Sequence, residues 1–198
     1  MNATATSDLV YSGAEILLSA QSSEDGLNME QSKTAVLIRR ATLADAPSLA
    51  SVLRDSFLEY KLLYTPEAFA ATTPTSEQMK VRLNEGPVWA AVYNGDIVGT
   101  VAVAPRSEGL YIRRMGVLPT ARGHRIGELL LKEIERYALQ QGHSRLFLST
   151  TPFLHRAIRL YEQFGFRRTN VGPHDLFGTP LFTMEKRLET LPSRRAEA

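Results

Sequence analysis

The chain has 198 residues, 43% of them hydrophobic and 22% charged, and a formal net charge of +2. This composition is ordinary for a globular domain, and so small an excess of positive charge does not require an anionic polymer as partner. Because there is no cysteine, the sequence excludes a disulfide framework, a thiolate nucleophile and a Cys-ligated metal. The four histidines lack the spacing of metal ligands, so we expect no metal site.

Residues 1–34 are rich in Ser, Thr, Ala, Asn and acidic side chains, with one short apolar patch at residues 14–18. We interpret this segment as a flexible tail. No basic stretch precedes the patch, and the patch is too short for a signal core or a membrane span, so we expect a cytoplasmic protein with no membrane partner. The alternative is a strand or short helix that docks on a partner chain, and a homodimer is left open.

A β-branched run at residues 36–41 predicts the first strand. Residues 42–45 have the form of a capping box, and Pro47 suits the first turn of a helix. Apolar residues at helical spacing carry this helix to about Leu58. Residues 59–75 break the pattern with aromatic residues and prolines.

After Thr75 or Ser76, either of which can cap a helix, the sequence predicts a short helix that ends at Gly86-Pro87. A β-hairpin follows it. The hairpin strands, residues 88–93 and 96–103, flank Asn94-Gly95, a pair that tolerates the positive φ values of a two-residue turn. After a loop at residues 105–109, residues 110–117 form the next predicted strand.

A strand end, a proline turn, a Gly- and Arg-rich loop and an amphipathic helix follow one another from residue 115 onward. A helix that opens on free backbone N–H groups suits a phosphate or pyrophosphate, because the unpaired donors coincide with the positive end of the helix dipole. Arg122, His124 and Arg125 add charge at the same place. A strand at residues 146–150 follows the helix, so we expect a right-handed crossover, parallel neighbouring strands and a cofactor where those strands part.

Residues 152–164 predict another helix, with Tyr161 on its apolar stripe and Gly165 as its left-handed cap. The default role of such a tyrosine is packing in the core. Residues 181–188 alternate between apolar and polar side chains and predict an edge strand.

Two stretches resemble motifs of the GNAT superfamily of acyl-CoA-dependent N-acetyltransferases. The loop at residues 122–127, RGHRIG, lies between a Val-x-Pro strand end and a Leu-rich helix and resembles motif A, while residues 157–166, AIRLYEQFGF, resemble motif B. The order and spacing of both motifs fit. Arg125 departs from motif A, because it stands where the family usually has a central glycine. If that glycine serves only close approach to phosphate, Arg125 keeps the amide in place; if the position needs φ > 0, the loop must differ.

The resemblance implies an α/β (α+β) fold with a mixed, largely antiparallel sheet flanked by helices and a parallel, splayed strand pair at the cofactor cleft. It divides the chain into a tail at 1–34, an acetyltransferase domain at 35–188 and a charged tail at 189–198. It also implies transfer of an acetyl group from acetyl-CoA to a primary amine of a small molecule, amino acid or peptide, by direct attack without a covalent enzyme intermediate. The alternative is a non-catalytic module that binds acyl-CoA as a sensor.

The cofactor-binding residues that the resemblance implies lie at a strand end and in the loop after it: Met115, Gly116, Val117, Arg122, Gly123, His124, Arg125, Ile126 and Gly127. Gly116 admits two interpretations, a bulge that frees amides for the pantetheine arm or relief of crowding in the sheet. Tyr161 would protonate the leaving thiolate, since a phenol and an aliphatic thiol have similar acidities. Leu154 stands where the family often has an Asn, so one polar contact to the cofactor is lost.

Three aromatic residues of the 59–75 segment either line the acceptor pocket or pack under a loop: Tyr60, Tyr64 and Phe69. The general base is not evident, because Arg113 and Arg114 occupy the strand on which the family frequently places a Glu. Glu108, Glu59 or a chain of water molecules could serve. Arg113 hints at an acceptor with a carboxylate, although arginines on strands are more often solvated or ion-paired. The arginine pairs are spread through different elements, so we expect no nucleic-acid partner.

Overall fold

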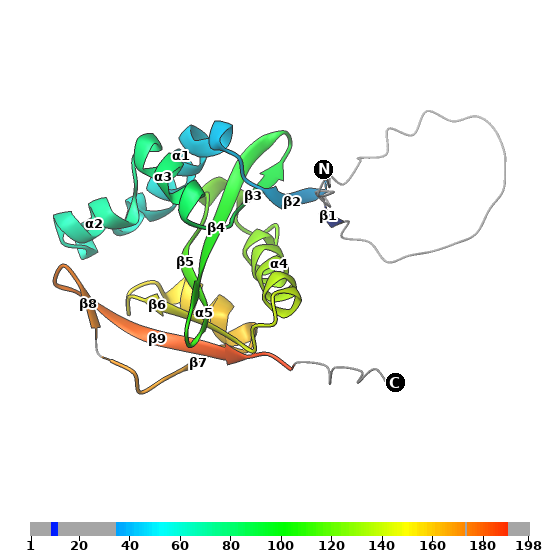
Figure 1. The fold of residues 1–198 in the computed structure, drawn as a ribbon. Coiled ribbons are helices and arrows are strands. Elements are labelled where there is room, and N and C mark those ends of the chain that lie inside the picture. The colour runs from blue at the N-terminus through cyan, green and yellow to red at the C-terminus, as the bar shows by residue number, and fades with distance from the viewer. Residues whose placement is uncertain (1–8, 12–34, 173, 190–198) are drawn as a thin grey trace, which may run out of the picture.

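The structure, a computed structural model, describes residues 9–11, 35–172 and 174–189. Its strands are β1 (Leu9–Tyr11), β2 (Val36–Arg40), β3 (Val88–Tyr93), β4 (Asp96–Arg106), β5 (Gly109–Val117), β6 (Arg145–Thr150), β7 (Arg167–Arg168), β8 (His174–Leu176) and β9 (Thr179–Arg187). They form one sheet in the order β1-β2-β3-β4-β5-β6-β9-β7, with β8 paired to β9 (Figure 1). The strand pairs are antiparallel except for β5 and β6, which are parallel. The predicted fold class is therefore confirmed.

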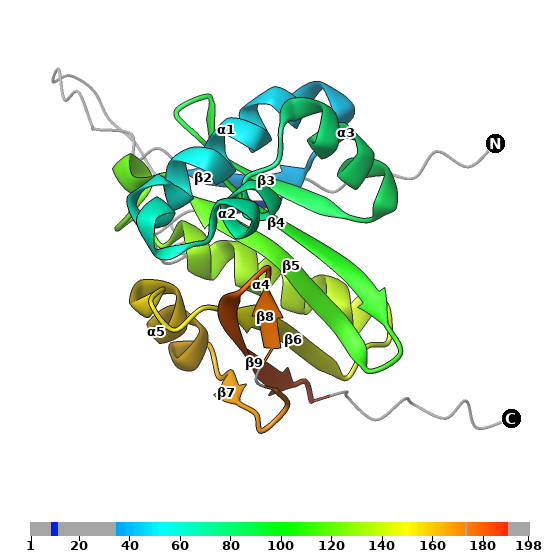
Figure 2. The same ribbon diagram turned by 90° about the vertical axis from the view of Figure 1, so that its left-hand side faces the viewer.

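The helices are α1 (Ala46–Phe57), α2 (Pro66–Thr72), α3 (Ser76–Glu85), α4 (Ile126–Gln140) and α5 (His155–Gln163), with the 3-10 helices η1 (Leu43–Asp45), η2 (Leu58–Leu63) and η3 (Pro119–Ala121). The first three α-helices lie on the opposite side of the sheet from α4 (Figure 2). Strand β3 shows how the sequence produces these layers. Val88 and Ala90 pack with α1 and α3, whereas the alternate residues Trp89 and Ala91 pack with α4, because successive side chains of a strand point to opposite faces.

Most of the predicted elements are present with small shifts of their ends. The backbone N–H of Thr42 donates to Asp45 Oδ2 over 2.7 Å, which confirms the capping interaction before α1. The turn between β3 and β4 has φ of 54° at Asn94 and 88° at Gly95, as its sequence predicts. The loop expected at 105–109 is shorter, since β4 continues to Arg106 and β5 begins at Gly109.

Two features differ from the sequence-based predictions. The segment at 59–75 contains η2 and α2, whose seven residues are too few to show a clear helical period. The prediction of an edge strand at 181–188 is wrong, because β9 pairs with β6 on one side and with β7 on the other. Strand β7 has only two residues, so no sequence pattern reveals the neighbour that covers this edge.

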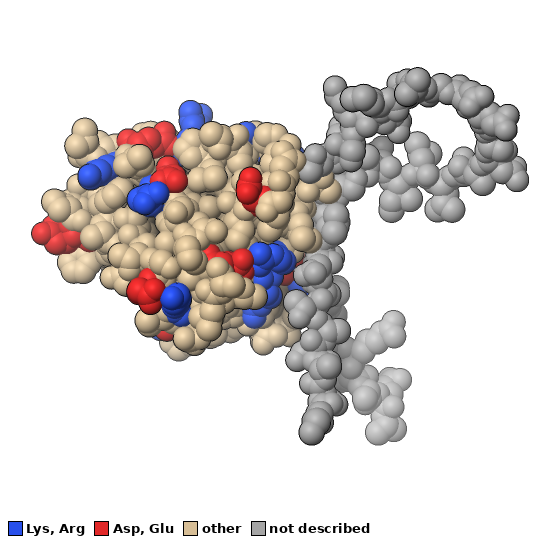
Figure 3. Space-filling view, turned by 90° about the horizontal axis from the view of Figure 1, so that it is seen from above, with Lys and Arg blue, Asp and Glu red and all other residues tan. Residues whose placement is uncertain are grey.

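The terminal segments lie largely outside the described residues. Of the predicted tail at 1–34, residues 9–11 form β1, which pairs antiparallel with β2. The domain division at 34 and 188 and the cytoplasmic location remain predictions. None of the helices in the described ranges is long and apolar enough to cross a membrane. On the face seen in Figure 3, acidic and basic side chains are interspersed.

Candidate active site

The parallel strands β5 and β6 separate soon after they meet. They pair only from Leu110 opposite Leu146 to Ile112 opposite Leu148, while β5 itself continues to Val117. The N–H of Leu118 donates to Val98 O on the β4 side over 2.8 Å. Because backbone N–H groups alternate in direction along a strand, those of Val117 and Met115 face the opposite, open edge. The splayed pair expected at the cofactor cleft is present.

A β-bulge interrupts β5 at Arg113, three residues before Gly116, where the sequence allowed a bulge. Ala102 pairs with Arg114 and the next residue, Val103, pairs with Ile112, so Arg113 is the extra residue. Gly116 itself continues the register opposite Thr100. A Cβ at Gly116 would lie 3.0 Å from Ser56 Oγ on α1. Of its two interpretations, the structure therefore supports relief of crowding, here by the close approach of α1.

The loop between η3 and α4 contains residues with positive φ. Gly123 has φ of 91° and Arg125 has φ of 58°, so this position does require the left-handed conformation, and an arginine adopts it. The Arg125 guanidinium makes two hydrogen bonds of 2.9 Å to the Glu128 carboxylate in the first turn of α4. These bonds hold the pKa of Glu128 down at about 2.

Gly127 is required by close packing rather than by its backbone angles. A Cβ built at this position would lie 2.7 Å from Leu160 Cδ2 on α5 and 3.2 Å from Met115 Cε on β5. The first turn of α4 therefore meets α5 and the open edge of β5 at one point. A larger side chain would force Leu160 and Met115 to move and would disturb the contacts between these elements.

The other two basic residues of the loop, Arg122 and His124, have partners within the protein. The Arg122 guanidinium forms an ion pair with Glu59, which lies on η2. His124 Nδ1 lies 3.3 Å from the carbonyl oxygen of Ala121, and its ring centroid is 4.7 Å from that of Tyr93. The donors that this loop can offer to an anion are therefore chiefly its backbone N–H groups.

A cavity of about 660 Å³ runs along the open edge of β5. It is lined by most of the residues expected to bind the cofactor, namely Met115, Gly116, Val117, Arg122, Gly123, Arg125, Ile126 and Gly127, together with Tyr161. His124 is not among its lining residues. The structure thus brings together, from β5, the loop, α4 and α5, residues that span 47 positions of sequence from Met115 to Tyr161.

Tyr161 lies in the wall of this cavity with 7% of its surface exposed. Burial raises the pKa of its phenol, and the phenols of Tyr64 and Tyr111 raise it further. The group consequently stays protonated at neutral pH and is available as a proton donor. Its ring packs against Phe166, the last residue of the second motif, with 5.8 Å between ring centroids.

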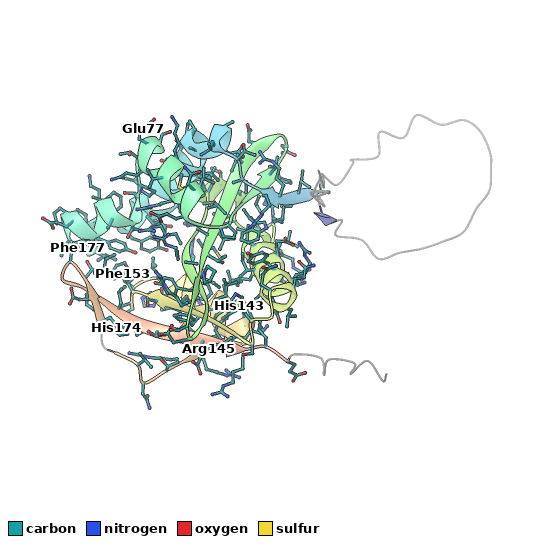
Figure 4. All side chains as sticks on the ribbon, viewed as in Figure 1. Glu77, His143, Arg145, Phe153, His174 and Phe177 are labelled. Carbon is teal, nitrogen blue, oxygen red and sulfur yellow. The ribbon has the colours of Figure 1, made fainter. Side chains whose placement is uncertain are left out.

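The opposite end of the cavity is enclosed by η2, α2 and the β8–β9 hairpin. Tyr60 and Tyr64 line it, but Phe69 does not, because Phe69 packs against the Tyr64 ring at 6.2 Å. The Thr65 hydroxyl donates to the carbonyl oxygen of Phe177 at the hairpin tip over 2.8 Å. Figure 4 shows Phe177 beside the end of α2. Burial raises the pKa of Tyr64 to about 12, so this end also presents a protonated phenol.

The cavity wall also contains residues that were not predicted as such, among them Tyr111 and Arg114. Tyr111 could have been found from the alternation of β5, because Leu110 and Ile112 on either side of it belong to the core. The direction of Arg114 depends on the bulge at Arg113, and the sequence contains no sign of that bulge. Neither Glu59 nor Glu108, the carboxylates considered as a general base, lines the cavity.

The sequence matches the acetyltransferase (GNAT) family over residues 49–166. An uncharacterized N-acetyltransferase of Escherichia coli, YjgM, is 33% identical over 135 residues, which are 66% of this chain and 81% of that protein. An IAA acetyltransferase of Azospirillum brasilense is 43% identical over 98 residues, 48% of this chain and 63% of that protein. The PaiA N-acetyltransferase of Thermoplasma acidophilum, solved in complex with coenzyme A, is 20% identical and superposes with a TM-score of 0.66, covering 77% of this chain and 98% of its own. That structure shows a shared fold.

Proposed function

Since the chain belongs to the acetyltransferase (GNAT) family and is an N-acetyltransferase, we propose that it transfers an acetyl group from acetyl-CoA to a primary amine by direct attack. The observation that carries this proposal is the open edge of β5. There the amides of Met115 and Val117 face a cavity that has the glycine loop of α4 in its wall and the Tyr161 phenol beside it.

The residues that would hold acetyl-CoA fit its chemistry. The segment at 122–127 runs into the first turn of the 15-residue helix α4, and free N–H groups at such a helix start suit a pyrophosphate. The N–H groups of Met115 and Val117 can donate to the amide carbonyls of the pantetheine arm. Gly127 lets the first turn of α4 approach Met115 and Leu160 closely. When bound, acetyl-CoA supplies the acetyl group as a thioester.

The protein's own residues then act by alignment and proton transfer. The neutral amine nitrogen forms a C–N bond to the acetyl carbon, the C–S bond breaks, and the electron pair goes to sulfur. Tyr161 gives its proton to the thiolate and recovers one from solvent. The amine nitrogen loses one proton, so charge and atoms balance. Alignment of the two reactants and N–H donors aimed at the thioester oxygen supply most of the rate enhancement.

We infer that water in the cavity carries the amine proton away. Glu59 is ion-paired with Arg122, and Glu108 lies in the turn between β4 and β5, where its carbonyl oxygen accepts from Arg145 over 3.4 Å. Both carboxylates lie outside the cavity wall. A proton path through water needs no carboxylate in contact with the amine.

Two measurements distinguish binding of acetyl-CoA from acetyl transfer. Acetyl-CoA at micromolar concentration should raise the melting temperature, because ligand that binds only the folded state stabilises it. When the protein is then incubated with acetyl-CoA and a panel of amines, amino acids and peptides, at least one acceptor should cause release of free thiol. No thermal shift at millimolar acetyl-CoA would contradict both the enzyme and a sensor. A thermal shift without thiol release from any acceptor would favour the non-catalytic sensor.

A further inference from the structure

The bulge in β5 directs two consecutive arginines to the same face of the sheet. Arg113 Nη1 lies 2.6 Å from Glu85 Oε2 at the end of α3, and Arg114 Nη2 donates to the carbonyl oxygen of Ala71 in α2 over 2.8 Å. Neighbouring residues of a regular strand point to opposite faces, and the extra residue of a bulge removes that alternation. Both guanidinium groups therefore lie beneath α2 and α3.

A third arginine reaches the same point from α3. Arg82 Nη2 lies 3.3 Å from the Ala71 carbonyl oxygen that Arg114 also contacts. Its other terminal nitrogen, Nη1, is buried and has no hydrogen-bond partner among the residues that the structure describes. A buried guanidinium nitrogen without an acceptor lowers the stability of the fold, because its lost hydration is not replaced.

Positive charge is in excess at this point. Among the described residues, the carboxylate that forms an ion pair with one of these three arginines is that of Glu85. It pairs with Arg113, and its side chain is exposed. Burial, together with the charges of Arg82 and Arg113, lowers the pKa of Arg114 to about 10. Arg82 does not line the acetyltransferase cavity, but an anion bound there at Arg114 would offset the repulsion between the three charges.

The excess charge borders the cavity of the acetyltransferase site. Arg113 and Arg114 line that cavity, together with Arg106 from the end of β4. Arg114 directly precedes Met115, so their Cα atoms are only about 3.8 Å apart. An anion held by Arg114 in this cavity would therefore share it with the strand edge assigned to the pantetheine arm.

We propose that the acceptor is a free amino acid whose carboxylate binds the guanidinium of Arg114, with Arg82 and Arg113 adding to the positive field. This inference rests on the proposed function. Arg114 is the anchor because Arg113 already has a carboxylate partner, whereas among the described residues the hydrogen-bond partner of Arg114 is a carbonyl oxygen, that of Ala71. A free amino acid fits because its carboxylate and its amine are only one or two carbons apart. In a peptide the N-terminal amine and the C-terminal carboxylate are separated by the whole chain.

The test compares acceptors that differ only in charge. Thiol release is measured with alanine, β-alanine and aspartate, and with the corresponding amides. We expect kcat/KM to be about 10- to 100-fold higher for a carboxylate acceptor than for its amide, as for a charge-assisted hydrogen bond. Amidation makes the amine less basic and so supplies more of its reactive neutral form, which biases the comparison against this result. Equal values for all pairs would overturn the inference.

Variants at Arg114 locate the anchor. Arg114→Gln should lower kcat/KM for the carboxylate acceptor about 10- to 100-fold, mainly through KM, and lower it much less for the amide, while Arg114→Lys should retain part of the preference. Arg54→Gln is the matched control, because Arg54 is exposed on α1 and pairs with Asp55. A preference that survives in Arg114→Gln would overturn the assignment.

A binding measurement separates this inference from the proposed function. The amino acids are titrated without acetyl-CoA by thermal shift, and the carboxylates, but not the amides, should stabilise the wild type and not Arg114→Gln. Stabilisation by acetyl-CoA in Arg114→Gln confirms that this variant is folded. If amides are acetylated as fast as acids, the amino-acid inference fails and the acetyltransferase remains. If carboxylates bind but no thiol is released, the proposed chemistry fails and the anion site remains.

Discussion

Tyr161 is the residue on which the proposed chemistry depends most directly. It lies on the buried, apolar side of α5, as the sequence predicts for a core residue. It also borders the cavity. Burial raises its pKa, which keeps the proton on the phenol, and the same desolvation would raise the basicity of a thiolate formed beside it, so that proton transfer stays feasible. Packing and catalysis are therefore compatible roles for one side chain.

Replacement of Tyr161 by Phe should separate these roles. Because only the hydroxyl is removed, we expect kcat to fall about 100-fold, within the range of general acid catalysis, with KM for acetyl-CoA changed much less. Steady-state kinetics checks this, with Tyr137→Phe as the control, since Tyr137 packs on Trp89 away from the cavity. An unchanged kcat would leave Tyr161 with packing alone.

Arg125 carries a backbone cost that its sequence motif usually avoids with glycine. Its φ of 58° is unfavourable for an L-residue by about 1–2 kcal/mol. We predict that Arg125→Gly is more stable than Arg125→Ala by about 1 kcal/mol in urea unfolding. Both variants lose the ion pair with Glu128, so that loss cancels. Arg159 is the control, because it is exposed to solvent and lies in the middle of helix α5. There Arg159→Ala should be more stable than Arg159→Gly, because glycine weakens a helix interior by about 1 kcal/mol. Equal stability of the glycine and alanine variants at position 125 would contradict the prediction.

At the scale of elements, β5 combines three local structures within nine residues. Its start pairs with β6, its middle contains the bulge at Arg113, and its end presents unpaired N–H groups to the cavity. The first turn of α4 meets this end through Gly127. The cofactor cleft is thus a junction of strand and helix ends, and its geometry depends on how closely they approach.

Gly127→Ala should disturb that junction. The added Cβ would overlap Leu160 Cδ2, at 2.7 Å, so we expect a loss of about 1–3 kcal/mol of stability and weaker acetyl-CoA binding as the loop is displaced. Gly142→Ala is a suitable control, because Gly142 has φ of 75° and open space around it. That variant should also lose stability, through strain, but bind acetyl-CoA as the wild type does. Calorimetric titration distinguishes them, and normal affinity in Gly127→Ala would refute the role of close packing.

For the whole molecule, the cavity joins segments from both halves of the chain. Its wall combines η2 and α2 with α5 and the β8–β9 hairpin, and hydrophobic clusters on both faces of the sheet hold these layers together. The site therefore exists only when the sheet is complete. Conditions that unfold the sheet should abolish cofactor binding at the same midpoint.

Stability should fall on both sides of a neutral plateau in pH. Hydrogen bonds from Arg39 lower the pKa of Asp45, and Arg125 lowers the pKa of Glu128 to about 2. A lowered carboxyl pKa stabilises the fold above the unfolded pKa, about 4, and this contribution is lost as pH falls toward 2. The raised pKa values of Tyr64 and Tyr161 act oppositely, stabilising below about pH 10 and losing effect above it.

Melting temperatures measured from about pH 2 to pH 11 check this profile. Asp45→Asn should flatten the acid side and Tyr161→Phe the alkaline side. Glu77→Gln, at an exposed residue of α3 (Figure 4), should leave both sides unchanged. If Asp45→Asn keeps the full acid dependence, the bonds from Arg39 do not control it.

The sequence by itself determined the order of the main elements, the hairpin at Asn94-Gly95, the crossover through α4 and the two motifs that border the cleft. These are local patterns of periodicity, capping and turn residues, and they act over a few positions of the chain. Only the tertiary structure decided that β9 is covered by β7, that the bulge lies at Arg113 and that Arg82 joins Arg114. The physical reason is that pairing register and helix approach depend on contacts between residues distant in sequence, which leave no periodic trace in either partner alone.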